Sequence, residues 1–185
     1  MKCYHGTDKQ AANSILIHGF KSSLGDSEWL GDGVYAFTEG ISEPKEDAKK
    51  WTEFKCWDNK QKIQKFQFGA VLKLKVADDV EKTLNLNTKD GVDLFKFIKA
   101  ECVEKLKELK NKRKLRYIDG FLINFARKEL DLDISVVIGN VYIKLDPKDR
   151  ILDLGQRVPN CTICCINDQS LIQEKRIAEV WRIKL

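Results

Sequence analysis

Two strand-like segments enclose a single helix near the start of the chain, and this arrangement constrains the fold most. The segment Cys3–Thr7 is expected to form a short strand that runs into a polar helix cap. Leu30–Phe37 is expected to form a glycine-containing loop that runs into a second strand. Between them, apolar residues recur at helical spacing and Gly19 is placed to end the helix. If the two strands lie side by side, His5 and Tyr35 line one cleft.

The residue types at this cleft favour a ligand that carries sugar hydroxyls and a carboxamide on a flat ring, as NAD does. His5 offers an imidazole donor, Gly6 and Gly33 offer exposed backbone amides, and Tyr35 offers an aromatic face. His-Gly-Thr, a helix that ends in Gly-Phe, and then Gly-x-Gly-x-Tyr together resemble the ADP-ribosyltransferases of the diphtheria-toxin and poly(ADP-ribose)-polymerase type. The resemblance is strongest over residues 3–52.

The resemblance implies a fold and a set of site residues. The fold is α+β, an ADP-ribosyltransferase-like split β-sandwich of mainly antiparallel strands with flanking helices and a central NAD cleft. The family's histidine bonds the ribose on the adenosine side, the glycine beside it bonds the carboxamide, and its tyrosine stacks on the nicotinamide. By motif these residues are His5, Gly6 and Tyr35, and Thr7 completes the first motif. Trp51 is either a second aromatic wall of the NAD pocket or a simple core residue.

The third catalytic position of the family has no obvious match in this chain. Polymerase-type relatives carry a glutamate at the start of a late strand, whereas residues 160–166 contain no acid. Thr162 is our first choice for the matching position and Cys161 our second, because a one-residue register shift exchanges the two faces of a strand. Relatives without the glutamate generally transfer single ADP-ribose units. The resemblance therefore implies mono-ADP-ribosylation or a catalytically inactive NAD-binding module.

Periodic patterns predict the remaining elements of the fold. Helices are expected over residues 44–56, 88–110 and 121–130, and strands over 66–76, 83–86, 134–145, 161–166 and 177–185. Gly139 and Asn140 are interpreted as a turn or bulge inside one strand, 147–150 as a turn, and 151–154 as a short apolar segment. Together these elements predict an α+β fold with two packed, mainly antiparallel sheets in one domain that spans residues 1–185.

Length and composition set the outer limits. The chain has 185 residues, of which 43% are hydrophobic, as expected for one globular domain. No segment approaches the roughly 18 uninterrupted apolar residues of a membrane span, and no apolar signal region precedes the first motif. We therefore expect a cytoplasmic protein that does not contact a membrane and keeps its six cysteines reduced. Cys161 and Cys164 have the spacing of half a zinc site, but without a second Cys/His pair we predict no metal site.

The net charge of +5 is concentrated in one segment, residues 99–116. This segment contains eight basic residues and three acidic ones. The basic residues are Lys99, Lys105, Lys107, Lys110, Lys112, Arg113, Lys114 and Arg116. A solvated helix face is the simplest interpretation, and a contact with RNA or DNA is the alternative.

These observations lead to one functional prediction with two alternatives. We expect an NAD-dependent mono-ADP-ribosyltransferase of the small bacterial or phage toxin type, which uses NAD as its substrate and releases nicotinamide. The predicted acceptor is a protein or a nucleic acid, and an antitoxin or inhibitor is a further expected partner. The alternatives are an inactive NAD- or ADP-ribose-binding module and an RNA 2′-phosphotransferase, which shares this fold but needs additional basic residues in its cleft.

Overall fold

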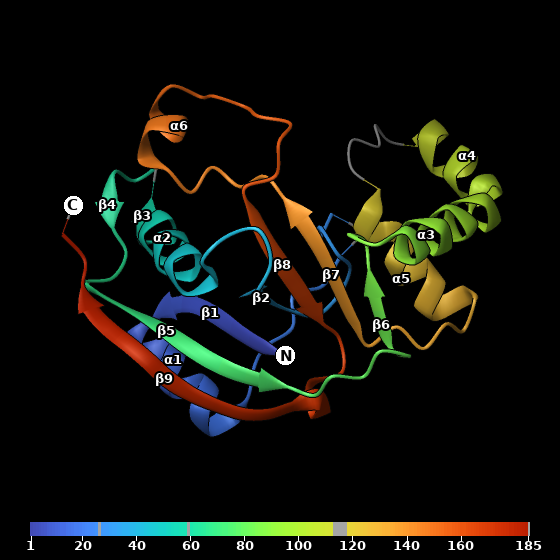
Figure 1. Cartoon of the computed structure of the whole chain (residues 1–185). Helices are drawn as coiled ribbons and strands as arrows, with labels where there is room; N and C mark the ends of the chain where they lie inside the picture. Colours follow the sequence, from blue (N-terminus) through green and yellow to red (C-terminus); the bar gives the residue numbers. More distant parts are fainter. Residues whose placement is uncertain (26, 59, 113–117, 185) are drawn as a thin grey trace.

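The computed structural model describes residues 1–25, 27–58, 60–112 and 118–184 and contains helices packed on a large sheet (Figure 1). The helices are α1 (Lys9–His18), α2 (Pro44–Cys56), α3 (Lys89–Glu101), α4 (Val103–Lys112), α5 (Asp119–Glu129), α6 (Pro147–Ile151) and the 3₁₀ turn Gln169–Leu171. The strands are β1 (Lys2–Asp8), β2 (Val34–Thr38), β3 (Trp57–Asp58), β4 (Ile63–Gln64), β5 (Phe68–Val76), β6 (Thr83–Asn85), β7 (Val136–Val141), β8 (Cys161–Ile166) and β9 (Ile172–Arg182). The predicted α+β class is confirmed at this level.

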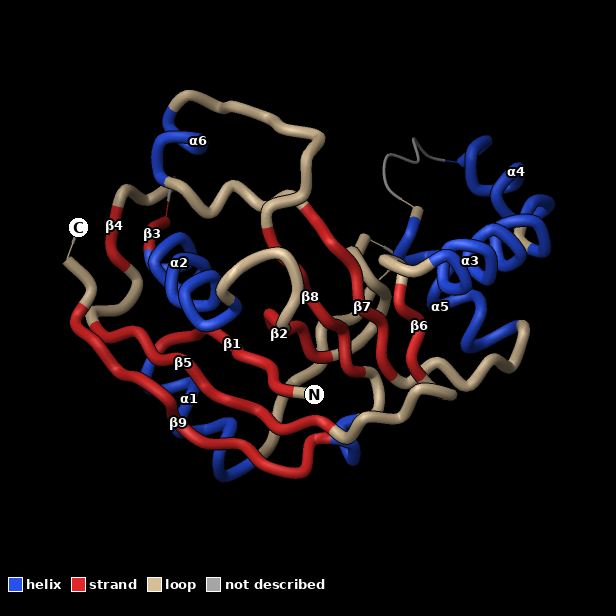
Figure 2. Tube along the Cα trace, viewed as in Figure 1, coloured by secondary structure: helices blue, strands red, loops and turns tan. Residues whose placement is uncertain are grey.

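Seven strands form one twisted sheet in the order β6-β7-β8-β2-β1-β5-β9 (Figure 2). Neighbouring strands pair antiparallel except β6 and β7, which are parallel. The short strands β3 and β4 form a separate hairpin. The first and last strands of the chain, β1 and β9, lie on either side of β5, so the beginning and the end of the chain share one half of the sheet.

The joint between the two halves of the sheet is short. Cys3 pairs with Thr38 and Tyr4 with Phe37, and beyond these two positions β1 and β2 separate. In contrast, β1 pairs with β5 along its whole length, from Lys2 to Asp8. The strands that we expected in two packed sheets are thus hydrogen-bonded into one sheet, because two residue pairs bridge the place where the halves diverge.

Helices cover both faces of the β1-β5-β9 half. In Figure 1, α2 lies in front of β1 and β5, and α1 lies behind β5 and β9. Two clusters of buried side chains result, one on the α2 side around Ala48 and Val71 and one on the α1 side around Ala12 and Leu72. Helices α3 and α5 pack beside the other half of the sheet, next to β6 and β7 (Figure 1). No helix in the described ranges has the length and apolar character that crossing a membrane requires.

The sequence pattern explains both helices that flank β1. In α1, the Asp8 carboxylate accepts a hydrogen bond from the Ala11 N–H at 2.8 Å, and Gly19 ends the helix with a φ of 83°. Pro44 starts α2, where the fixed φ of proline suits the first turn. α2 packs so closely on β1 that a Cβ at Gly6 would overlap the carbonyl oxygen of Ala48. Gly6 therefore sets the distance between helix and strand.

The expected helix over residues 88–110 is confirmed along most of its length, but it is divided into α3 and α4 at Cys102. This residue has a φ of −90° and a ψ of 0°, which departs from regular helix geometry, and its side chain is buried. Its N–H bonds to the carbonyl oxygens of both Ile98 and Ala100, so the last turn of α3 is tightened before α4 starts.

The structure also differs from the expected elements in the second half of the chain. Gly139 and Asn140 continue β7 without a turn, because the Asn140 side chain accepts a hydrogen bond from Thr162 and its N–H donates to Asn87. Residues 147–150 belong to the short helix α6 rather than a turn, and the apolar segment 151–154 is exposed. The last strand, β9, begins at Ile172, five residues before the expected start.

Candidate functional site

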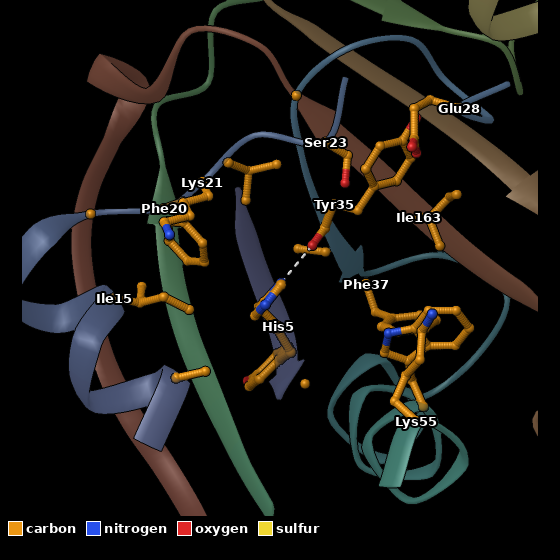
Figure 3. Close-up of a pocket in the computed structure, with 18 of the residues that line it drawn as sticks. His5, Ile15, Phe20, Lys21, Ser23, Glu28, Tyr35, Phe37, Lys55 and Ile163 are labelled. Atoms are coloured by element: carbon orange, nitrogen blue, oxygen red, sulfur yellow. Dashed lines mark hydrogen bonds between the residues drawn. The ribbon is translucent and has the colours of Figure 1, made fainter. Parts of the chain in front are cut away.

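A cavity of about 690 Å³ opens where β1 and β2 diverge. Its lining residues come from β1, α1, the loop before β2, β2 itself, α2 and β8 (Figure 3). His5, Gly6, Gly33, Tyr35 and Trp51, which the sequence predicted as ligand-binding residues, all line it. The volume lies within the range of ordinary small-molecule sites. The structure therefore brings both sequence motifs to one cavity.

The imidazole of His5 is held in one orientation. Its Nδ1 lies 2.7 Å from the carbonyl oxygen of Tyr35, across the gap between the strands (Figure 3). A carbonyl oxygen only accepts, so Nδ1 carries the proton. Burial lowers the pKa of His5 below its ordinary value of 6.5, against the opposing effect of this hydrogen bond. The ring is therefore neutral near pH 7, and Nε2 is left as an acceptor.

This tautomer changes the expected role of His5. The sequence suggested that the imidazole donates a hydrogen bond to the ligand. In the structure, the N–H at Nδ1 already donates to the carbonyl oxygen of Tyr35. Nε2 instead accepts, so the ligand group that faces it must carry a hydrogen, as a hydroxyl does. The ring of Phe20 packs edge-on against His5, with centroids 5.2 Å apart and an interplanar angle of 79°. Phe20 thus fixes the imidazole from the loop side.

Tyr35 is fixed by hydrogen bonds at its hydroxyl. The oxygen accepts from the N–H of Leu30 at 2.7 Å and donates to the carbonyl oxygen of Gly31 at 2.7 Å. Burial raises the pKa of this hydroxyl well above its ordinary value, so the phenol remains protonated and able to donate. Because the hydroxyl is tied to the loop, the ring face is left as the part of Tyr35 that a ligand can contact.

The loop before β2 is anchored on α5. The side chain of Asn124 accepts from the N–H of Asp32 at 2.8 Å and donates to its carboxylate at 2.9 Å. Arg127 donates to the carbonyl oxygen of Asp32 at 3.1 Å, and Lys128 lies 3.5 Å from its carboxylate. The loop before β2 is therefore attached to the scaffold at its end next to β2.

Gly33 lines the cavity, but its backbone amide is not free for a ligand as we expected. Its N–H donates to the carbonyl oxygen of Ser23 at 3.0 Å, and its own carbonyl oxygen accepts from the Ser23 N–H at 2.9 Å. The backbone amide of Gly33 is therefore already paired within the loop. A side chain at this position would approach Cys165 Sγ to 2.6 Å, so glycine is needed for the close packing of β2 on β8.

Trp51 and Lys55 form the α2 side of the cavity. Trp51 is half-buried, lines the cavity and also packs against the α2-side core, so it has features of both the aromatic wall and the core residue. The ammonium group of Lys55, one turn later in α2, lies 4.8 Å from the centre of the Trp51 ring. Lys55 also lines the cavity and brings a cation to it, together with Lys21 from the loop.

Neither residue expected at the third catalytic position lines the cavity. Thr162 is buried on the α1 side of β8, where its hydroxyl donates to Asn140 at 2.7 Å and accepts from the Ile41 N–H at 3.1 Å. Cys161 is buried in the α2-side core, and burial raises the pKa of its thiol to about 12. Because side chains alternate along a strand, Ile163 is the β8 residue that reaches the cavity wall.

Thr7 is also outside the cavity lining. It is half-buried in β1 opposite Ala70 of β5, and Asp8 caps α1. The first motif therefore contributes His5 and Gly6 to the cavity, while Thr7 belongs to the strand that carries them.

Several cavity residues were missed by the sequence analysis. Glu28, Phe37, Lys55 and Ile163 line the cavity without belonging to a recognised motif. The alternation of β2 could have placed Phe37 beside Tyr35. Glu28 lies in an irregular loop, where no periodic signal indicates the direction of a side chain.

The basic segment 99–116 is described only in part. Lys105 pairs with Glu129 at 2.9 Å, and Lys107 pairs with Glu104 at 2.6 Å. Arg113, Lys114 and Arg116 lie outside the described residues, as do the side chains of Lys110 and Lys112. Two lysines of this segment therefore have carboxylate partners on the protein itself, which agrees with the simpler interpretation of a solvated helix face.

Comparisons with known proteins add one distant relative. No family model matches the chain. An uncharacterized protein of Methanocaldococcus jannaschii is 28% identical to it over 141 residues, which cover 71% of this chain and 58% of the relative. The chain thus spans less than two thirds of the length of that protein. The description of that protein indicates no activity.

Proposed function

We propose that this protein is an NAD-dependent mono-ADP-ribosyltransferase, with the split β-sandwich of that superfamily as its fold. The observation that carries the proposal is the pairing of His5 with Tyr35. They come from separate sequence motifs, line one cavity and are joined by a hydrogen bond where the sheet divides. This combination supports a ligand that spans both halves of the sheet.

The chain's own groups match the parts of NAD. Nε2 of His5 accepts a hydrogen bond and so suits a ribose hydroxyl. The ring of Tyr35, fixed through its hydroxyl, and the indole of Trp51 offer aromatic faces to the nicotinamide. The cations of Lys21 and Lys55 on the cavity lining suit the negative diphosphate.

ADP-ribosyl transfer breaks the bond between ribose C1′ and the nicotinamide nitrogen and forms a bond from C1′ to an acceptor. Because nicotinamide leaves as a neutral molecule, the reaction needs no general acid. The protein must hold the ring still, orient the ribose and exclude competing reactions, which are effects of position and electrostatics. A neutral His5 suits the orienting part of this task, because its Nε2 can accept a hydrogen bond from a ribose hydroxyl.

The test measures nicotinamide release from NAD by the purified full chain. We expect release by the unaltered protein and loss of release after His5→Ala or Tyr35→Ala, while Ser22→Ala, outside the cavity lining, serves as the control. Labelled NAD incubated with a cell lysate, followed by separate protease and nuclease digestion, identifies whether the acceptor is protein or nucleic acid. An unaltered protein that leaves NAD intact contradicts the proposal.

A second candidate is an NAD- or ADP-ribose-binding module without transfer activity. It is favoured by Ile163, an apolar residue on the part of β8 that faces the cavity. Calorimetry with NAD distinguishes the two candidates, because a module binds NAD and leaves it intact. The RNA 2′-phosphotransferase alternative gains some support from Lys21 and Lys55, and a 2′-phosphorylated RNA substrate tests it directly.

A further inference from the structure

We propose that Glu28, from the loop before β2, supplies the catalytic carboxylate for transfer that β8 does not provide. The inference rests on the proposed function and adds a residue to it. Among the described residues that line the cavity, Glu28 is the only one with a carboxylate. The strand β8 offers Ile163 to the same cavity, and its neighbours Cys161 and Thr162 are buried elsewhere.

Glu28 is placed next to the proposed nicotinamide site. In Figure 3, His5, Tyr35 and Glu28 follow one another across the cavity, and Ile163 lies on the same side as Glu28. Burial is the largest cause of the raised pKa of the Tyr35 hydroxyl, and the negative charge of Glu28 adds a smaller contribution in the same direction. Glu28 is half-buried and lines the cavity.

The backbone of Glu28 is supported on several sides. Its N–H donates to the carbonyl oxygen of Gly25 at 3.3 Å. Its carbonyl oxygen lies so close to α5 that a Cβ at Gly120 would overlap it. Two residues later, Leu30 donates its N–H to the Tyr35 hydroxyl. These contacts fix the backbone of Glu28 relative to Tyr35, and positioning a catalytic group begins with such a fixed backbone.

The carboxylate has a definite task in the reaction. When the bond from C1′ to the nicotinamide nitrogen breaks, the bonding electrons leave with the nitrogen and C1′ gains positive charge. The negative carboxylate of Glu28 stabilises this charge. As an oxygen or nitrogen of the acceptor forms its bond to C1′, the proton that it loses passes to Glu28 and then to solvent. The products are nicotinamide, the ADP-ribosylated acceptor and one proton.

The experiment compares Glu28→Gln with the unaltered full chain, with NAD as substrate and water as acceptor. Glutamine keeps the size and removes the charge, so we expect kcat for nicotinamide release to fall by about 100-fold or more with KM for NAD unchanged. Glu39→Gln is the matched control, because Glu39 is exposed and outside the cavity lining, and it should keep the unaltered rate. Thermal unfolding of each variant checks the fold.

A second variant separates a chemical role from a structural one. In Glu28→Ala, added sodium formate should restore part of the nicotinamide release, whereas sodium chloride at the same ionic strength should not. A Glu28→Gln variant with the unaltered kcat overturns the role of Glu28 and leaves the proposed function intact. An unaltered protein that binds NAD and releases no nicotinamide overturns both. A rise in KM alone also overturns the inference, because it assigns Glu28 to binding only.

Discussion

The Nδ1 atom of His5 lies 2.7 Å from the carbonyl oxygen of Tyr35, in the position where a backbone bond between β1 and β2 is missing. One side chain therefore does two things at once. It closes the gap between the strands with its protonated nitrogen and turns its other nitrogen, an acceptor, to the cavity. Substitutions at and around this pair should affect both stability and ligand binding. Variants that remove a single hydrogen bond, charge or methyl group can separate the two effects.

The lowered pKa of His5 predicts a loss of stability in mild acid. Below the ordinary pKa of 6.5, the unfolded chain binds a proton at this position that the folded chain, with its lower pKa, does not. The unfolded state is then favoured, so the free energy of unfolding falls as the pH decreases from 7 to 5. His5→Asn keeps a donor for the Tyr35 carbonyl and cannot titrate.

This variant should show a weaker decrease over the same range, measured by urea unfolding at each pH. His18→Asn, a change at an exposed histidine, is the control and should follow the unaltered protein. Equal slopes for His5→Asn and the unaltered protein would contradict the prediction.

Tyr35→Phe should loosen the loop before β2 while leaving the aromatic face in place. The change removes the partner of the Leu30 N–H and the donor to Gly31, at a cost of about 1–3 kcal/mol. We expect a lower Tm and faster hydrogen exchange at Leu30. NAD affinity should decrease less than in Tyr35→Ala, which also removes the ring. An unchanged Tm would show that the two hydrogen bonds do not stabilise the loop.

Gly6→Ala should destabilise the fold through the contact between β1 and α2. The added methyl group would overlap the Ala48 carbonyl oxygen and approach Thr52, both of which are fixed within α2. Overpacking of this kind costs about 1–3 kcal/mol or more. Gly155→Ala is the matched control, because its new methyl group meets nothing within 4 Å. Chemical denaturation of the two variants should therefore give clearly different midpoints.

Thr162→Val should reduce stability and leave NAD turnover unchanged. Valine keeps the shape but leaves the Asn140 carboxamide and the Ile41 N–H without their hydroxyl partner, which costs about 1–3 kcal/mol. Thr162→Ser retains the hydroxyl and should lose only about 0.8 kcal/mol for the missing methyl group. A large decrease in kcat for Thr162→Val but not for Thr162→Ser, with Tm unchanged, would return the Thr162 hydroxyl to the catalytic site.

The first part of the fold could be predicted because its signals are local. Asp8 and Gly19 mark the ends of α1, and Pro44 marks the start of α2, through backbone geometry that depends on neighbouring residues alone. The position of His5 and Tyr35 on one cavity followed from the assumption that their strands are neighbours. The sheet order supports that assumption, although the strands pair over only two positions.

The third catalytic position could not be predicted for a physical reason. All six residues of β8, from Cys161 to Ile166, are buried, so the strand lacks the alternation of apolar and polar residues that tells one face from the other. The choice between Thr162 and its neighbours then depends on long-range pairing with β2 and β7. Glu28 is a similar case, since its direction is set by contacts with α5 that lie far away in the sequence.

The two-residue joint between β1 and β2 has a mechanical consequence. We expect the width of the cavity to change more easily than the spacing of the other strands, because only two residue pairs join β1 to β2. A molecule that contacts His5 on one side and the ring of Tyr35 on the other would link the two halves of the sheet across this joint. Its binding should slow the movement of the two halves of the sheet apart. The outer strands β6 and β9 should then also move less relative to each other.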